Sequence, residues 1–169
     1  DLVFQPIFSL NPLVPVELET LLRWENPRLG QVSPAEFIPL AEEMGLINDI
    51  GAWIMEEACR RHSSWRAQGL AAGDLRLAVN CSAIQLKNGE LPELVADILQ
   101  SSKMPPRLLT IEVTETAMIS GMEPHWDKLE ALRLMGVKLA IDDFGAGYSS
   151  MGALAQLPLD SVKIDRSFI

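Results

Sequence analysis

The sequence predicts an α/β protein in which short apolar strands alternate with amphipathic helices. From Leu75 onward the expected order is strand, helix, strand, helix, strand, helix, strand, in units of roughly 25 to 35 residues. This spacing is expected of right-handed βαβ crossovers. A doubly wound sheet and a (β/α)8 barrel both fit it. No G-x-G-x-x-G fingerprint follows the first strand of the series, which weakens the dinucleotide-binding version of the doubly wound fold.

Two strands are expected before the first helix. The first covers residues 2–8, and Pro6 within it indicates an edge or end position, because proline donates no ladder hydrogen bond. A turn at Asn11-Pro12 leads into a second strand over residues 14–24. We expect the first strand to run antiparallel to the others.

The helices carry recognisable end signals. Ser33, Pro34 and Glu36 mark the start of a helix that ends at Gly45. A longer amphipathic helix over residues 47–68 follows it. The remaining expected elements are strands at 75–79, 108–113, 137–141 and 161–164, and helices at 92–101, 124–135 and 149–156.

Composition bounds the class of protein. A chain of 169 residues, 48% of them hydrophobic, can bury one sizeable core as a single domain. The net charge of −9 is spread along the chain, which argues against polymeric nucleic acid and direct membrane contact as partners. Cys59 and Cys81 lack metal or redox spacing, which favours free thiols in a reducing, cytoplasmic compartment. The start at Asp1 and the end at Ile169, just after a strand, read as a piece of a longer protein.

The stretch from Val137 to Ser150 concentrates the candidate chemistry. An apolar run ends in Asp142 and Asp143, and a glycine-punctuated loop follows. Carboxylates at the carboxyl end of a buried parallel strand occupy the usual active-site position of α/β folds. The structural alternative is an Asp helix cap beside a Gly turn.

Polar residues recur at the ends of the other expected strands. In a parallel barrel these ends share one face, where several carboxylates would repel one another without cations between them. The set contains oxygen ligands without His or Cys, which favours Mg²⁺ or Mn²⁺ over Zn²⁺, and adjacent aspartates can bridge two metal ions. The residues concerned are Glu19, Asn80, Glu112, Glu115, Asp142, Asp143, Lys163 and Asp165.

Several of these residues have a second interpretation. Asn80 can cap the following turn, and Glu115 can orient a loop instead of binding metal. Lys163 can face the barrel interior between carboxylates and act there as a general base with a lowered pKa. His62 and His125 are expected to be surface or structural residues, since they lie away from the strand ends.

The chain resembles the EAL-type cyclic di-GMP phosphodiesterases from Phe4 to Ile169. The segments that carry the resemblance are Gln5-Pro6-Ile7, Glu19-Thr20-Leu21-Leu22-Arg23-Trp24, Ser33-Pro34-Ala35-Glu36-Phe37-Ile38, Val79-Asn80-Cys81-Ser82, Glu112-Val113-Thr114-Glu115, Asp142-Asp143-Phe144-Gly145-Ala146-Gly147-Tyr148-Ser149-Ser150 and Val162-Lys163-Ile164-Asp165. The resemblance implies a TIM-like (β/α)8 barrel. It also implies hydrolysis of cyclic di-GMP to linear pGpG by metal-activated water, with two Mg²⁺ or Mn²⁺ ions, in bacterial second-messenger signalling.

The resemblance also implies a role for each site residue. Lys163 is expected to orient or deprotonate the attacking water, with Asp143 and Glu115 as further catalytic residues, the latter steadying the loop after Asp143. The implied metal ligands are Glu19, Asn80, Glu112, Asp142 and Asp143, and the implied substrate contacts are Gln5, Leu21, Arg23 and Asp165. A possible homodimer and fusion to sensory or GGDEF-type domains are the implied partners.

The sequence departs from the family pattern in three ways. Thr20 stands where alanine is usual in the signature triplet, and Ala146 stands where threonine is commoner. The two further strand–helix units of the family, with another metal-site Glu and a Gln, are missing. We therefore interpret residues 1–169 as an EAL-type domain truncated before its last two units. If the chain truly ends at Ile169, weak or absent activity and a catalytically silent cyclic di-GMP receptor become the alternative, and a third possibility is an interaction surface.

Overall fold

The computed structural model describes residues 1–70, 73–87, 90–115, 117, 126–145 and 159–168. Its centre is a six-stranded sheet with the strand order β1-β2-β5-β6-β7-β8. β1 pairs antiparallel with β2, and every later neighbour is parallel. The strands are β1 (Leu2–Leu10), β2 (Leu13–Leu22), β5 (Arg76–Cys81), β6 (Leu109–Thr114), β7 (Lys138–Phe144) and β8 (Ser161–Ile164).

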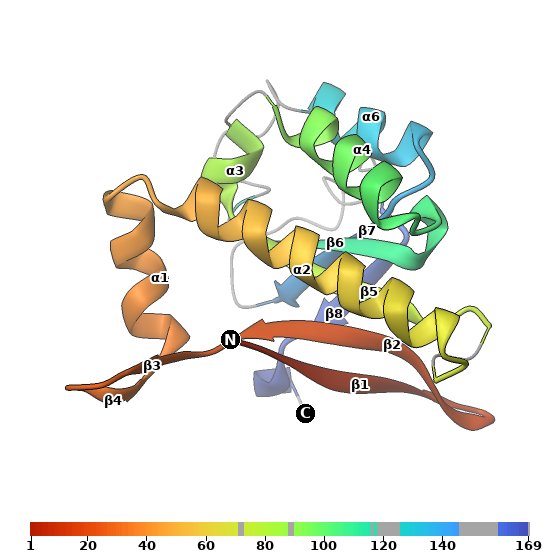
Figure 1. The fold of residues 1–169 in the computed structure, drawn as a ribbon, viewed down its shortest axis with the longest axis horizontal. Coiled ribbons are helices and arrows are strands. Elements are labelled where there is room, and N and C mark those ends of the chain that lie inside the picture. Colours follow the sequence, from red (N-terminus) through yellow and green to blue (C-terminus); the bar gives the residue numbers. More distant parts are fainter. Residues whose placement is uncertain (71–72, 88–89, 116, 118–125, 146–158, 169) are drawn as a thin grey trace.

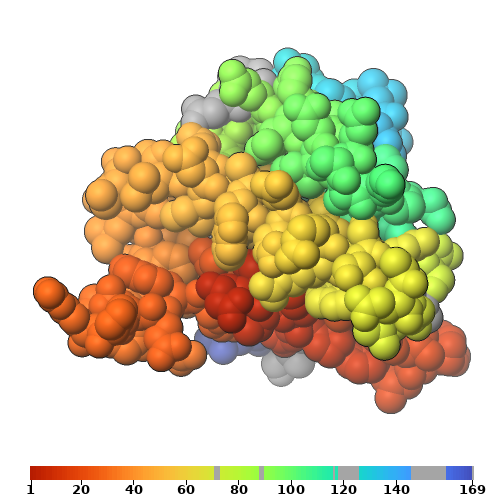
Figure 2. Space-filling model, in the orientation of Figure 1, coloured from red at the N-terminus to blue at the C-terminus, as the bar shows by residue number. Residues whose placement is uncertain are grey.

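The helices α2, α4 and α6 gather on one side of this sheet. α2 and α4 contact each other, α4 contacts α6, and α2 contacts β5 (Figure 1). Figure 2 shows α2 crossing the middle of the view, between β1 and β2 below it and α4 above it. The helices are α1 (Pro34–Glu43), α2 (Ile47–Ala67), α3 (Ala83–Lys87), α4 (Leu91–Ser102) and α6 (Trp126–Leu134), with short 3₁₀ turns η1 (Pro106–Leu108) and η3 (Arg166–Phe168).

Strand alternation separates a dry face of the sheet from a polar one. Successive side chains point to opposite faces, so alternate positions of β5, β6 and β7 meet the helices. These positions are buried and apolar: Leu77, Val79, Cys81, Leu109, Ile111, Val113, Leu139 and Ile141. The residues between them line the inner face of a curled half-barrel, and this face carries the polar side chains.

The expected fold class is confirmed: this is an α/β fold, and its described strands form a curled half-barrel of the TIM-like kind. The antiparallel first strand is confirmed too, and β1, which contains Pro6, lies at an edge of the described sheet. His62 is structural: it is buried, and its Nε2 lies 2.8 Å from the carbonyl oxygen of Leu75. The helix expected over 149–156 and His125 fall outside the described residues.

Two short elements differ from the expectation. The end of the predicted second strand forms a separate hairpin of β3 (Trp24–Asn26) and β4 (Gly30–Val32), whose turn is held by Asn26 Oδ1 accepting from the backbone N–H of Arg28 and Leu29. α3 was not expected. Among the described helices, none is both long enough and apolar enough to cross a membrane.

Candidate active site

Strand register places oxygen-bearing side chains of three neighbouring strands, β2, β5 and β6, on the inner face. Glu19 of β2 lies opposite Ala78 of β5, and Asn80 of β5 lies opposite Glu112 of β6. Residues two apart on a strand share a face. Ala78 and Asn80 are two apart on β5 and so share a face. The side chains of their partners, Glu19 and Glu112, therefore lie on the same side of the sheet as that of Asn80.

The next two strands extend this set. Thr114 pairs with Asp142 of β7, which puts Asp142 on the face of Glu112. Ser161 of β8 pairs with Ala140, so Lys163, two residues further, also points inward. The small side chains of Ala78 and Ala140 leave space between the larger polar groups.

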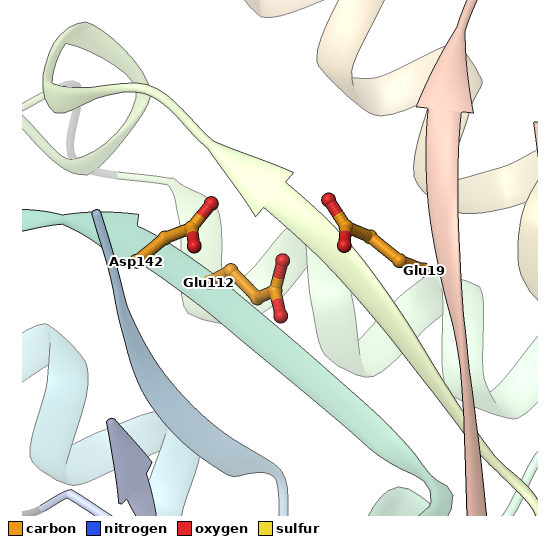
Figure 3. A group of neighbouring side chains, drawn as sticks. All are labelled: Glu19, Glu112 and Asp142. Carbon is orange, nitrogen blue, oxygen red and sulfur yellow. The ribbon is translucent and has the colours of Figure 1, made fainter. Parts of the chain in front are cut away.

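Three carboxylates converge on one point. Oxygens of Glu19, Glu112 and Asp142 all lie within 4.8 Å of one another. Figure 3 shows the three side chains, which come from β2, β6 and β7, pointing toward a shared centre. Carboxylates this close repel one another unless a cation lies between them.

Lys163 supplies that positive charge. Its Nζ lies 3.1 Å from Glu19 Oε2, 2.9 Å from Glu112 Oε2 and 3.1 Å from Asp142 Oδ1. Burial lowers the pKa of Lys163, but the hydrogen bond to Glu112 and the three negative charges outweigh it and raise the pKa. With one ammonium facing three carboxylates this arrangement raises the pKa, whereas a general base beside metal-bound water, the role expected from the sequence, has a lowered one.

Glu112 lies deepest of the three carboxylates. Its side chain is 1% exposed, and burial raises its pKa to about 7 against the opposing effect of Lys163. Glu19 and Asp142 are half-buried, each with a side chain 18% exposed. The cluster is thus closed toward the sheet and open toward the strand ends.

Asp143 has an irregular backbone. Its φ is +53°, in the left-handed region that non-glycine residues rarely adopt, and the β7–β8 register shifts between Ile141 and Phe144. Such a bulge breaks the alternation that would send Asp143 to the face opposite Asp142. Burial, followed by the charges of Asp142 and Asp165, raises the pKa of Asp143.

The backbone after Asp143 is held from the neighbouring strand. Glu115 follows the end of β6, is 2% exposed, and accepts a hydrogen bond of 2.6 Å from the backbone N–H of Gly145. Gly145 has φ +100°, which favours glycine. Glu115 thus contacts the loop and is not among the three carboxylates that converge.

A cleft of about 690 Å³ opens beside the cluster. Leu21, Arg23, Asn80 and Asp143 are among its lining residues, together with apolar side chains of α1 and α2. Arg23 Nη1 donates to the carbonyl of Leu22 at 2.9 Å, and no other residue that the structure describes takes a hydrogen bond from its guanidinium. The structure therefore brings two of the four expected substrate contacts to the cleft.

The other two expected contacts lie elsewhere. Gln5 of β1 is paired with Glu19, so it shares the inner face, but it does not line the cleft. Asp165 follows β8, and its Oδ1 accepts from the backbone N–H of Ser167 at 2.8 Å, a bond that lowers its pKa.

Ser82 and Gln85 are among the polar cleft residues that sequence reasoning did not assign to the site. Ser82 Oγ accepts from the N–H of Gln85 at 3.4 Å, and Gln85 Oε1 accepts from the N–H of Ser82 at 3.1 Å. This is a capping box, which the pattern Ser-x-x-Gln directly after the strand of Asn80 signals.

The fold and the site define a class: an α/β half-barrel with an acidic, oxygen-donor site at the carboxyl ends of its strands. A family model described as the EAL domain matches residues 1–169, and the chain belongs to that family. The resemblance predicted from the sequence is confirmed.

Two relatives named as cyclic di-GMP phosphodiesterases are similar over nearly the whole chain. The bifunctional diguanylate cyclase/cyclic di-GMP phosphodiesterase MucR of Pseudomonas aeruginosa is 44% identical over 154 residues, covering 91% of this chain and 22% of MucR. The cyclic di-GMP phosphodiesterase NbdA of the same organism is 41% identical over 169 residues, covering 100% of this chain and 21% of NbdA. The chain spans about a fifth of the length of these relatives.

Solved structures agree with the fold. The PaMucR phosphodiesterase in its c-di-GMP complex superposes with a TM-score of 0.91 at 41% identity, over 99% of this chain and 67% of that chain. The FimX EAL domain from Pseudomonas aeruginosa bound to c-di-GMP gives a TM-score of 0.85 at 28% identity, over 99% and 66%.

Proposed function

We propose that this chain is the catalytic part of a cyclic di-GMP phosphodiesterase that produces linear pGpG with two divalent metal ions, Mg²⁺ or Mn²⁺. The observation that carries the proposal is the convergence of Glu19, Glu112 and Asp142 at the strand ends, beside a cleft. Relatives named as cyclic di-GMP phosphodiesterases support the substrate.

The donor set fits a hard divalent cation. The converging atoms are carboxylate oxygens, which Mg²⁺ and Mn²⁺ prefer. Lys163 Nζ lies among the three oxygens at ion-pair distance, so the position already accommodates a positive charge. Ions bound here would stabilise charge on the phosphate and activate water for in-line attack.

The proposed ligands form two groups. Glu19, Glu112 and Asp142 form the convergent group. Asn80 lies beside Glu112 in register, and the bulge brings Asp143 to the cleft. Asn80 and Asp143 add oxygen donors to the three carboxylates, and a second metal ion requires such additional ligands. Asp142 is proposed to bridge the pair.

The remaining residues are proposed to bind substrate and manage protons. Arg23, at the cleft, can donate two hydrogen bonds to a phosphate oxygen pair. Leu21 offers an apolar contact there, and Gln5 and Asp165 are proposed contacts from the flanking strands. Lys163 is proposed to orient the attacking water through Nζ. Glu115 is proposed to keep the loop after Asp143 in place.

The wider context of the domain is also a proposal. MucR is named as bifunctional, and DosP of Escherichia coli, 39% identical over 168 residues, as an oxygen sensor protein. We propose that this chain works in the cytoplasm beside a sensory or GGDEF-type domain, with a homodimer as a possible assembly.

A turnover assay on the protein that contains this chain tests the function. Cyclic di-GMP is incubated with Mn²⁺ or Mg²⁺, and pGpG is followed by chromatography. We expect turnover that chelation removes and that Glu19→Ala abolishes, while Glu56→Ala, on the exposed surface of α2, retains it. Binding of cyclic di-GMP with Ca²⁺ but no turnover with Mn²⁺ or Mg²⁺ would instead identify a receptor.

A further inference from the structure

Gly51 of α2 faces the side chain of Gln85 at very short range. A Cβ placed on Gly51 would lie 1.9 Å from Gln85 Nε2, 2.6 Å from Cδ and 2.9 Å from Oε1. Both residues are buried, and both line the cleft beside the carboxylate cluster. No side chain larger than hydrogen fits at position 51 while Gln85 stays in place.

The backbone of Gly51 does not require glycine. It lies inside α2, and its φ is outside the left-handed region. Alanine is favoured over glycine in a helix interior, because glycine loses more conformational entropy there. The reason for glycine at this position is therefore the close approach of Gln85.

Gln85 cannot simply rotate away. A terminal amide is normally flexible, but Gln85 is 5% exposed and its Oε1 accepts the backbone N–H of Ser82. Moving the amide would take the acceptor away from the partly buried N–H of Ser82, which is costly. The hydrogen bond between Gln85 and Ser82 therefore depends on the absence of a side chain at Gly51.

Ser82 lies two residues after Asn80, where the chain leaves β5 and enters α3. Asn80 is the next-to-last residue of β5 and pairs with Glu112. The two hydrogen bonds between Ser82 and Gln85 fix the backbone that follows Asn80. They therefore support the strand end from which Asn80 extends on the same face as Glu112.

We propose that Gly51 and Gln85 are positioning residues for Asn80. The missing side chain at Gly51 admits Gln85, and Gln85 in turn holds Ser82 and the strand end that carries Asn80. This inference rests on the proposed metal site. Neither residue contacts the carboxylate cluster; they act on metal binding through the backbone.

A double-mutant cycle tests the link: Gly51→Ala, Gln85→Ala and the pair together, in the protein that contains this chain. Mn²⁺ affinity is measured by calorimetry, and amide exchange at Ser82 by NMR. We expect each single variant to weaken Mn²⁺ binding about tenfold, as the loss of one partly buried hydrogen bond allows, and to speed exchange at Ser82. In the Gln85→Ala background the added Gly51→Ala should change neither, because the clash is gone.

Two results of this double-mutant cycle would overturn the inference. Unchanged Mn²⁺ affinity and Ser82 exchange in Gly51→Ala would overturn the inference, as would an equal further loss when Gly51→Ala is added to Gln85→Ala. Thermal unfolding separates misfolding from repositioning, since the double variant should unfold no earlier than Gln85→Ala. Wild-type protein that binds Mn²⁺ but does not hydrolyse cyclic di-GMP would contradict the proposed function alone, since the affinity comparison still decides the inference.

Discussion

The inner face of the half-barrel carries two polar layers that differ in charge balance. The upper layer is Glu19, Glu112, Asp142 and Lys163. The lower layer is Glu17, Arg76 and Thr110, with Glu17 and Thr110 each two residues earlier on the same strands as Glu19 and Glu112. In the lower layer Glu17 Oε1 accepts a hydrogen bond from Thr110 Oγ1 and lies 3.3 Å from Arg76 Nε.

The charge balance indicates that the lower layer stabilises the fold and that the upper layer is suited to binding cations. One carboxylate meets one guanidinium in the lower layer, so the pair is neutral. Three carboxylates meet one ammonium in the upper layer, so ionising all of them leaves two negative charges in excess. A cleft lined by Thr20, Asn80 and Asp143 opens beside the upper layer. Excess charge with access to solvent is what a site for cations needs.

The largest expected effect comes from neutralising the deepest carboxylate of the upper layer. Glu112→Gln keeps the shape of the side chain and removes its charge. We expect cyclic di-GMP hydrolysis to fall at least about 100-fold, or about 2.7 kcal/mol. Thermal stability without metal should not fall, because burial already disfavours the ionised form of Glu112. Glu56→Gln is the matched control, and activity within tenfold of wild type would contradict the assignment.

Removing the lysine should expose the imbalance of the upper layer directly. Lys163→Met leaves three carboxylates without the cation described among them, so the metal-free protein should lose about 1–3 kcal/mol of unfolding free energy. This is below the range for fully buried pairs because the Lys163 side chain is 27% exposed. Mn²⁺ should raise the melting temperature of the variant more than that of wild type. An equal rise in both, measured by differential scanning fluorimetry, would contradict the view of Lys163 as the neutralising cation.

A substitution in the lower layer should reduce stability and leave hydrolysis nearly unchanged. Glu17→Gln removes the charge that meets Arg76 and weakens the bond from Thr110, so we expect a loss of about 1–2 kcal/mol in urea unfolding. Hydrolysis by the folded variant should stay within about twofold of wild type. A loss of turnover as large as that of Glu112→Gln would show that the two layers are not separable.

Much of the upper layer could be predicted from the sequence because strand alternation and strand ends are local patterns. Without any distances, the sequence predicts Asn80, Glu112 and Asp142 at or near the ends of their strands and Glu19 within its strand. The pKa direction of Lys163 could not be predicted, since it depends on how many carboxylates converge from other strands. The lower layer escaped prediction for the same reason: Glu17 and Thr110 are ordinary strand residues until the register brings them together.

Irregularities of the backbone also could not be predicted from the sequence. Adjacent aspartates in a regular strand point to opposite faces, so the sequence left a helix cap and a metal site both open for Asp142 and Asp143. The positive φ of Asp143 and the register shift beside it change the direction of the chain at that point. The contact between Gly51 and Gln85 was equally hidden, because glycine within a helix gives no sign of which distant side chain it admits.

The smallest expected effect lies at the exposed rim of the lower layer, where Lys138 Nζ is 2.6 Å from Asp160 Oδ1. Both side chains are partly exposed, 45% and 30%, so Lys138→Met should cost less than about 1 kcal/mol near pH 7. Partial burial raises the pKa of Asp160, but the bonds from Lys138 and from the Leu139 N–H outweigh it and lower the pKa.

The sign of that pKa shift makes the small effect testable by pH. A carboxyl group whose pKa is lower in the folded protein stabilises it above the unfolded value, about 3.9, and this stability is lost as the pH falls through the folded value. Urea unfolding of Lys138→Met and wild type should therefore differ near pH 7 and converge below about pH 4 as Asp160 is protonated. A difference that persists or grows at low pH would mean that Lys138 stabilises the sheet through packing of its aliphatic stem and not through charge.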